Sequence, residues 1–389
     1  IMLAMYQALA EKRGYPKDRI SATPQNDILK EMIGRGAWIF PVADAVRLVG
    51  DSIAYSMEEL PRCNPVSICG YHIRESGATP AQEIACAFEI ARAYIADVAG
   101  RGIEPDAFVG RFSFNFNVFG NLWEQIAKFR AARKLWAKML KEDYGVQDKK
   151  KLFLRGLFGG GGSGLTKAQP ENNIMRSAFY ALGAALSGAQ TTALCSFDEA
   201  YTIPTPRAAL LSLRTLEILM EEVGLRDTVD PLAGSYFIET LTCQMEEKIL
   251  KEMKAIQDAG GMVNAVSKGY IQRKVARQAY EYEKGLQEGE YIKVGFNKYV
   301  DEGDDQPDVD LHQYNDAWAD EQVTRLNSLR RERDGKAVKT ALKALEQAAR
   351  QKENVMPPLV ACCRAYATVG EMAGVFRDVF GEWREPQLF

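Results

Sequence analysis

The chain has 389 residues, of which 47% are hydrophobic, enough for one large domain or two ordinary ones with a sizeable core. Its formal net charge of -3 argues against nucleic acid as a partner, and no apolar run approaches the length of a membrane span. The seven cysteines are odd in number and scattered, which favours reduced thiols in a cytoplasmic protein over a disulfide framework or a metal site.

Short apolar runs typical of buried strands recur in the first half of the chain, each followed by a stretch with helical periodicity. The predicted strands are 20–25, 66–72, 111–117, 152–158 and 191–198, and the helices between them are 27–35, 80–99, 122–144 and 172–187. This alternation predicts a parallel sheet covered by helices. Five βα units fit an open sheet or part of a closed eightfold barrel, and periodicity does not choose between them.

The second half of the chain shows helical periodicity without strands. We predict helices at 206–223, 239–259, 270–288, 317–350 and 358–379, with an acidic surface loop over 300–316. Three regions follow from this pattern: a βα region at 1–205, a helical region packing on it at 206–300, and an acidic loop with helices at 301–389. Because the sequence begins inside an amphipathic helical pattern, we expect it to be cut from a longer chain.

His72 ends the second predicted strand, and a helix signal follows at once. The carboxyl ends of the strands are where α/β barrels place their chemistry, so this residue is a candidate catalytic group. The alternative is a core histidine that bonds to backbone. Arg35 stands between Gly34 and Gly36, where a ligand can approach closely and the guanidinium can grip a carboxylate. A solvated surface arginine is the alternative.

Two further segments carry candidate ligand contacts. Residues 156–165 are rich in glycine and follow a predicted strand, so their amides could form an anion nest, although the end of a P-loop is missing. A flexible loop without a ligand fits equally well. Asp198 and Glu199 close the last predicted strand, where a carboxylate can accept sugar hydroxyls or cap the next helix.

Longer motifs resemble the large subunit of the methylmalonyl-CoA mutase family, in order and nearly end to end. They are residues 21–31, 70–72, 77–83, 128–133, 198–200, 230–236, 294–299 and 367–372. The resemblance implies an α/β fold of the (β/α)8 TIM-barrel type, threaded by the pantetheine arm of an acyl-CoA. It also implies adenosylcobalamin at the carboxyl end of the barrel. This chain would hold about five C-terminal βα units, strands 4–8, followed by an α-helical region that leads toward a small cobalamin-binding subunit.

The resemblance assigns roles residue by residue. Gln25 and Arg35 match substrate-binding residues, the arginine pairing with a free carboxylate of the acyl group. His72 matches the histidine that hydrogen-bonds the thioester carbonyl, and Lys150 matches a substrate-binding lysine near the cofactor-facing rim. Glu199 matches the glutamate that holds the ribose of the cofactor.

Gly159 and Ala200 are expected to face the cofactor as well. Asp310–His312 resembles the start of the motif that carries the family's cobalt-binding histidine. Asn315 stands where that motif has glycine, so His312 is expected to be a loop residue. The cobalt ligand would therefore come from another domain or subunit, and a hetero-oligomer is expected.

The chain departs from the family at 156–162 and 192–195, where two histidines, a glutamine and an asparagine are replaced by small or apolar residues. One interpretation is a roomier pocket for a bulkier alkylsuccinyl- or alkylmalonyl-CoA. The other is a non-catalytic paralogue that binds acyl-CoA or a partner subunit. The favoured prediction is an isomerase that rearranges the carbon skeleton of a carboxylated acyl-CoA, of methylmalonyl-CoA/succinyl-CoA type, by adenosylcobalamin-dependent radical chemistry.

Overall fold

The computed structural model describes residues 1–301 and 309–386, so part of the expected acidic loop lies outside the described residues. Within them one parallel sheet forms in the order β1-β2-β3-β4. Its strands are β1 Ser67–Cys69, β2 Ser113–Val118, β3 Gly156–Gly160 and β4 Thr191–Ala193. The crossovers carry α4 Gly70–Glu75, α5 Pro80–Ala99, α6 Pro105–Phe108, α7 Leu122–Asp143 and α8 Asn172–Leu186. The predicted βα alternation is confirmed for these units.

The prediction of a strand at 20–25 is wrong, because this segment forms no regular strand. The segment is extended and lies along the start of β1, where Asn64 N donates to Ala22 O (2.9 Å) and Ser67 N donates to Pro24 O (3.1 Å). Pro24 has no N–H to continue a ladder, which limits the pairing to these contacts. The described sheet is therefore open, and closure into an eightfold barrel stays a prediction.

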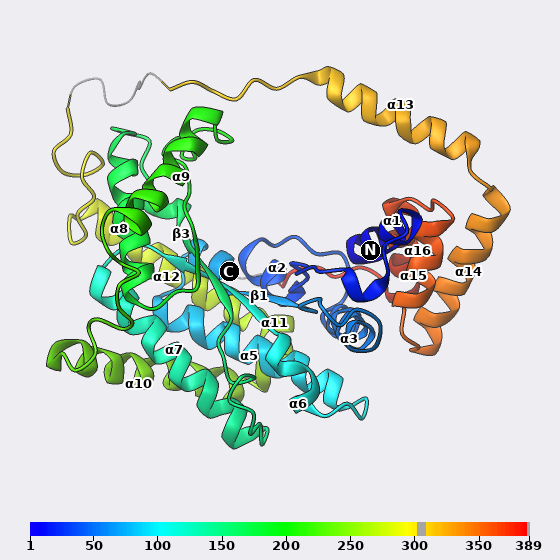
Figure 1. The fold of residues 1–389 in the computed structure, drawn as a ribbon, viewed down its shortest axis with the longest axis horizontal. Coiled ribbons are helices and arrows are strands. Elements are labelled where there is room, and N and C mark those ends of the chain that lie inside the picture. The colour runs from blue at the N-terminus through cyan, green and yellow to red at the C-terminus, as the bar shows by residue number, and fades with distance from the viewer. Residues whose placement is uncertain (302–308, 387–389) are drawn as a thin grey trace.

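The main core lies between the sheet and α5 and α7 (Figure 1). Trp136 of α7 packs edge-on against Phe114 of β2, with ring centroids 4.9 Å apart, and also contacts Phe88 of α5. Helix α10, Tyr236–Asp258, packs across the outer faces of α5 and α7 and adds Met245, Ile249 and Met253 to this core. Helix α5 is thus covered on both sides, which explains why nearly all of its residues are buried.

A buried ion pair joins α5 to α7 behind β2. Lys128 Nζ lies 2.8 Å from Glu83 Oε2, and both side chains are fully buried. Asn117 at the end of β2 completes the group, because its N–H donates to Glu83 Oε1 (2.7 Å) and its carbonyl accepts from Lys128. Since each buried charge has a partner and further hydrogen bonds, the pair fixes where β2 ends.

The remaining helices include α9 Pro206–Glu221, α11 Gly261–Ser267, α12 Tyr270–Gln287 and α13 Asp316–Glu332. The predicted helix 317–350 is in fact two, because Asp334 caps a new helix by accepting from Lys336 N (2.8 Å) and Ala337 N (3.1 Å). The predicted helix 358–379 also divides, since Thr368 and Glu371 form a capping box that starts α16, Val369–Phe380. No described helix is long and apolar enough to cross a membrane.

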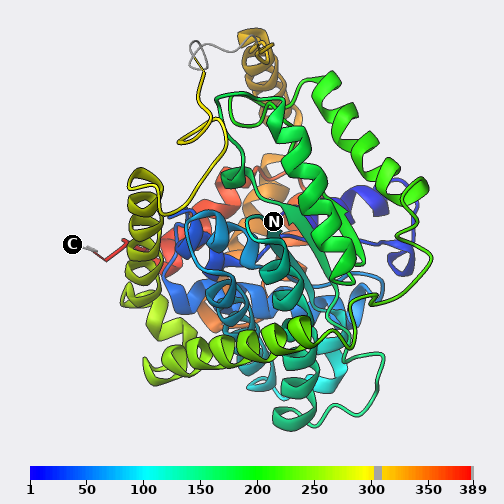
Figure 2. The ribbon, with the colours of Figure 1, turned by 90° about the vertical axis from the view of Figure 1, so that its left-hand side faces the viewer.

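A second core joins the two ends of the chain (Figures 1 and 2). Helix α1, Met2–Lys12, packs with α14 Gly335–Gln351, α15 Met356–Arg364 and α16 Val369–Phe380. Helix α3, Val42–Glu59, which sequence analysis did not predict, contributes to both cores. The C-terminal helices therefore pack on the N-terminal part of the chain, and the predicted region boundaries stay a prediction.

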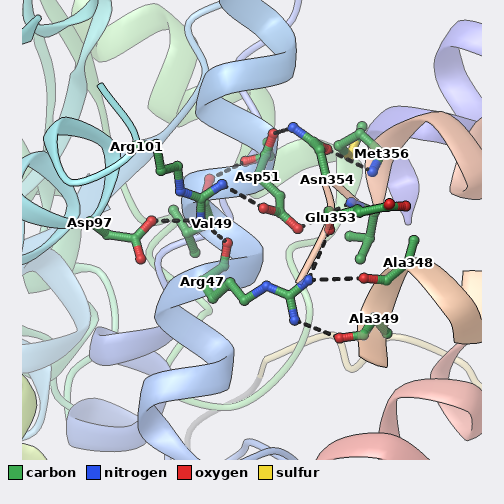
Figure 3. A network of polar contacts seen from close by, with 12 residues as sticks. Arg47, Val49, Asp51, Asp97, Arg101, Ala348, Ala349, Glu353, Asn354 and Met356 are labelled. Atoms are coloured by element: carbon green, nitrogen blue, oxygen red, sulfur yellow. Dashed lines mark hydrogen bonds and ion pairs between the residues drawn. The ribbon is translucent and has the colours of Figure 1, made fainter. Parts of the chain in front are cut away.

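Polar contacts fasten α14 and α15 to α3 (Figure 3). Arg47 donates to the carbonyls of Ala349 (2.9 Å), Ala348 (3.3 Å) and Glu353 (2.8 Å), which satisfies the last turn of α14. The buried Asp51 carboxylate accepts from Val355 N (3.1 Å) and pairs with Arg101. One arginine of α3 thus replaces water at the end of a helix that lies some 300 residues later in the chain.

We expect Arg47→Ala to loosen the C-terminal helices, because carbonyls at the end of α14 lose their donor. Amide hydrogen exchange over α14 and α15 should accelerate about tenfold, because the free energy of local opening falls by the contribution of roughly one or two hydrogen bonds. Arg350→Ala is the matched control, since Arg350 pairs only with Glu346 of its own helix among the ion pairs of the described chain and is 56% exposed. Equal exchange in both variants would contradict the role of Arg47.

Candidate substrate and cofactor site

The start of α2, Ile28–Gly34, is fixed by the buried carboxylate of Asp27. Its Oδ1 caps the helix by accepting from Lys30 N (3.2 Å) and also accepts from Tyr94 OH of α5 (2.6 Å). Its Oδ2 accepts from Cys69 N, the last residue of β1 (2.9 Å). Burial raises the pKa of Asp27 to about 6, against the opposing effect of these hydrogen bonds. The carboxylate therefore joins α2 to the carboxyl end of β1.

The end of α2 packs against α4. A Cβ added to Gly34 would lie 2.9 Å from the carbonyl carbon of His72, so only glycine allows this approach. Ser76 Oγ donates to Gly34 O (2.8 Å) and holds the two helices together. Arg35 follows directly, and its charge is one of the causes that lower the pKa of His72. The structure therefore brings Arg35 and His72 to one place, although they are far apart in sequence.

Gln25 joins the same cluster through two residues that sequence analysis missed. Lys30 has a fully buried side chain, and its Nζ lies 3.4 Å from Gln25 Oε1 and pairs with Glu31. Glu31 Oε2 in turn lies 3.7 Å from Arg35 Nη1, while the Arg35 side chain remains 53% exposed. A lysine between Leu29 and Met32 on the apolar face of a helix was the available signal in the sequence.

His72 does not end a strand, as the sequence suggested; it lies in the first turn of α4. Strand β1 stops at Cys69, and a Cβ at Gly70 would approach Glu83 Cγ to 2.8 Å, so close packing turns the chain there. Burial, the largest cause, and the charges of Lys30 and Arg35 together lower the pKa of His72 to about 4, against the opposing charge of Glu31. The imidazole is therefore neutral at neutral pH, and its Nδ1 lies 3.2 Å from Cys69 Sγ.

The glycine-rich segment is packed against the protein's own side chains. A Cβ at Gly159 would lie 3.2 Å from the Tyr71 ring, and one at Gly161 would lie 2.3 Å from Asn117 Oδ1. Glu75 accepts from the N–H and the hydroxyl of Ser163, both at 2.9 Å. Side chains of the chain itself occupy the space beside Gly159 and Gly161, and the anion bound by Ser163 is the carboxylate of Glu75. The roomier pocket for a bulkier acyl group stays a prediction.

The end of β4 meets the same edge of the sheet. Tyr71 OH lies 3.6 Å from Cys195 Sγ, and that thiol donates to Gly160 O (3.2 Å). Glu199 is exposed, and its Oε1 accepts from Ser196 N (2.7 Å). Asp198 is buried and accepts from the N–H of Thr205 (2.9 Å), so it holds the residue that caps α9. Of the two acidic residues, Glu199 is the one placed to meet a ligand, and Ala200 is half-buried beside it.

Two sequence candidates lie apart from this cluster. Lys150 is exposed in the loop between α7 and β3, at the amino end of the strands, and its N–H donates to Asp148 Oδ1 (2.9 Å). The expected position near the cofactor-facing rim is therefore not where the fold places it. His312 is an exposed loop residue as expected, with its N–H donating to Thr202 Oγ1 (2.9 Å).

A cavity of about 960 Å³ opens near the same edge of the sheet. Its lining includes Glu75 and Ser163 together with Tyr282 and Lys293, but it does not include Arg35 or His72. The described residues show no group of histidine, cysteine and acidic side chains that could hold a metal ion.

We expect Arg35→Ala to raise the pKa of His72, because one of the positive charges that oppose its protonation is removed. Histidine-labelled protein would be titrated by NMR, with His312→Gln identifying the second histidine signal. Lys30 opposes protonation and Glu31 favours it, and both remain in the variant. Arg350→Ala should leave the midpoint unchanged, and an unchanged midpoint in Arg35→Ala would show that the two groups are not neighbours.

Gly161→Ala should destabilise the protein by about 1–3 kcal/mol, the usual cost of overpacking, because the added Cβ collides with Asn117 and Glu75. Gly161 has an ordinary negative φ of -77°, so backbone strain does not contribute. Urea unfolding measures the change. The control is Gly370→Ala in α16, where an added Cβ has no atom within 4 Å. Equal stability of both variants would argue against the tight packing of this loop.

Comparisons with known proteins identify the family of the chain. The family described as methylmalonyl-CoA mutase matches residues 1–382. The chain is 37% identical over its whole length to the 2-hydroxyisobutanoyl-CoA mutase large subunit of Aquincola tertiaricarbonis, of which it covers 69%. It is 38% identical to a methylmalonyl-CoA mutase of Rhizobium meliloti and 35% identical to the ethylmalonyl-CoA mutase of Methylorubrum extorquens. These alignments take in 98% and 99% of the chain but only 54% and 57% of the relatives. The relatives are named mutases, which are isomerases, and the chain belongs to the methylmalonyl-CoA mutase family.

Proposed function

We propose that the chain is the acyl-CoA-binding part of an adenosylcobalamin-dependent mutase that rearranges the carbon skeleton of a carboxylated acyl-CoA. The observation that carries the proposal is the gathering of Gln25, Arg35 and His72 at one edge of the parallel sheet. A neutral imidazole and a guanidinium are suited to opposite ends of one substrate, a thioester and a carboxylate. Membership of a family whose named members are acyl-CoA mutases supports the same reaction.

His72 would donate a hydrogen bond to the thioester carbonyl. The lowered pKa keeps the ring neutral, so the donor is an imidazole N–H and no proton has to leave before the substrate binds. As the thioester group migrates to the neighbouring carbon, charge builds on the carbonyl oxygen. A donor fixed in a half-buried site stabilises that charge more than it stabilises the bound substrate.

Arg35 would hold the free carboxylate of the acyl chain. Its contact with Glu31, at 3.7 Å, is too long for a direct hydrogen bond, so N–H groups of the half-exposed guanidinium can still reach a ligand. The buried Lys30 already pairs with Glu31 and interacts with the carboxylate of Asp27. Arg35 is therefore the cation left to hold an anionic acyl group, which would have one end fixed and one hydrogen in position for abstraction.

The residues at the end of β4 fit the cofactor. The exposed carboxylate of Glu199 can accept hydroxyl groups, as a ribose requires, and Ala200 beside it offers no bulky side chain. Gly159 lies in β3, buried against the Tyr71 ring, so it would support the cofactor site from behind that ring. When bound, adenosylcobalamin would supply the radical that starts the rearrangement. We assign the cobalt ligand to another domain or to a small subunit, and one relative is itself named a large subunit. Lys150, at the amino end of β3, could contact only the distant end of an acyl-CoA that spans the sheet.

A second candidate substrate is an acyl-CoA that carries a hydroxyl group in place of the carboxylate. Arg35 already has an acidic neighbour in Glu31, and Gln25 offers a neutral amide to a hydroxyl. The relative from Aquincola tertiaricarbonis is named for such a hydroxylated acyl-CoA. The two substrates differ in charge, so the role of Arg35 distinguishes them.

We expect Arg35→Ala to lower the affinity for a carboxylated acyl-CoA by about tenfold or more, because a charge-assisted contact is lost. The affinity for a plain acyl-CoA should hardly change. Affinity would be measured by calorimetry on the complete protein with succinyl-CoA, 3-hydroxybutyryl-CoA and butyryl-CoA. Arg350→Ala is the control, because Arg350 is equally exposed and also pairs with a glutamate four residues away. Equal affinity of the unaltered protein for all three esters would reject the carboxylate assignment.

His72→Ala should lower kcat and leave substrate affinity nearly unchanged. The loss corresponds to roughly 2–4 kcal/mol of transition-state stabilisation. Carbon-skeleton exchange would be followed with isotopically labelled acyl-CoA in the holoenzyme. A holoenzyme that binds acyl-CoA and adenosylcobalamin but shows neither exchange nor radical formation would be the non-catalytic paralogue.

A further inference from the structure

Cys69 contacts the imidazole ring of His72 in the candidate site. It is the last residue of β1, it is fully buried, and its Sγ lies 3.2 Å from Nδ1 of the imidazole. Its backbone N–H is fixed by Asp27 Oδ2, and its side chain is enclosed by the core. The ring also packs edge-on against Tyr71, with centroids 5.5 Å apart. Both partners of the sulfur–nitrogen contact are therefore held by their surroundings.

The direction of this hydrogen bond follows from the chemistry of the two atoms. Burial raises the pKa of Cys69 to about 12, so the sulfur carries its hydrogen at neutral pH. A thiol is a weak donor and sulfur a weak acceptor, whereas a bare ring nitrogen is a good acceptor. The favoured arrangement is therefore S–H donating to Nδ1.

We propose that Cys69 is a positioning residue that holds His72 in the tautomer protonated on Nε2. The ring then presents a hydrogen-bond donor, and not an acceptor, to the acyl-CoA. The consequence for turnover rests on the proposed function, but the tautomer itself does not.

The charged groups around the ring do not reverse this assignment. Lys30 and Arg35 are donors and would favour a bare Nε2 if they lacked other acceptors. Lys30 is engaged by Gln25 and Glu31, and the half-exposed Arg35 has solvent as well as Glu31, at 3.7 Å, to accept from its N–H groups. The ring is therefore not required to accept from either cation, and Nε2 is left to carry the hydrogen.

NMR of histidine labelled with nitrogen-15 tests the tautomer directly. The chain has only two histidines, so His312→Gln leaves the signals of His72 alone. We expect the neutral ring to show a bare Nδ1 that accepts a hydrogen bond, and a protonated Nε2. A protonated Nδ1 in the unaltered protein would overturn the proposal.

Variants separate positioning from packing. Cys69→Ser keeps a donor and should keep the nitrogen shifts close to those of the unaltered ring, whereas Cys69→Ala should move Nδ1 to the shift of a free nitrogen. Cys86→Ala is the matched control, because Cys86 is a buried thiol of α5 whose pKa is likewise raised to about 12. Its replacement can change stability but should leave the His72 signals in place. Identical His72 signals in Cys69→Ala and the unaltered protein would also overturn the proposal.

Turnover provides the second measurement. In the holoenzyme, Cys69→Ala should lower kcat about fivefold, because one weak hydrogen bond is lost, and KM should stay nearly unchanged. Cys69→Ser should restore kcat. An unchanged kcat would overturn the role in turnover. Absence of turnover in the unaltered holoenzyme would contradict the proposed function, while the NMR result would still decide the tautomer.

Discussion

The carboxylate of Asp27 is the contact on which the site depends. Three donors from α2, β1 and α5 converge on it, and it is completely buried. Burying a carboxylate is unfavourable unless its oxygens are satisfied, and the raised pKa records that cost. Because the same group caps α2 and fixes the end of β1, it sets the distance between the segments that carry Arg35 and His72. A local helix cap thereby becomes a long-range constraint.

The fold was predictable where its signals are local. The starts of α5, α7 and α9 follow Thr79, Asn121 and Thr205, each of which caps its helix as its residue type suggests. The signals failed where distant contacts decide the structure. Strand β1 ends early because Gly70 lies against Glu83 and Phe116, which the periodicity of the neighbouring residues does not reveal. The break at Asp334 is different, because this aspartate caps its own helix and was a local signal that the prediction of one long helix overlooked.

The site shows the same division. Gln25, Arg35, His72 and Glu199 were found from the sequence, and the structure brings the first three into one cluster. Lys150 was assigned to the wrong end of the sheet, because a position in a motif does not show which end of a strand a loop occupies. The glycine segment suggested open space, yet its glycines are needed for side chains that come from β2 and α4. Those partners are about 40 to 90 residues away in the sequence.

The two ends of the proposed substrate are linked through the electrostatics of the site. Lys30 and Arg35 attract a carboxylate, and the same two charges oppose protonation of His72. Without an acyl group, Lys30 pairs with Glu31 and also interacts with the buried Asp27, while Arg35 has Glu31 at 3.7 Å. A carboxylate bound at the half-exposed Arg35 would weaken the penalty against an imidazolium. The ring can nevertheless stay neutral, because burial is the largest cause of its low pKa and an acyl group would increase burial. Carboxylate recognition and a neutral hydrogen-bond donor are therefore compatible at one site.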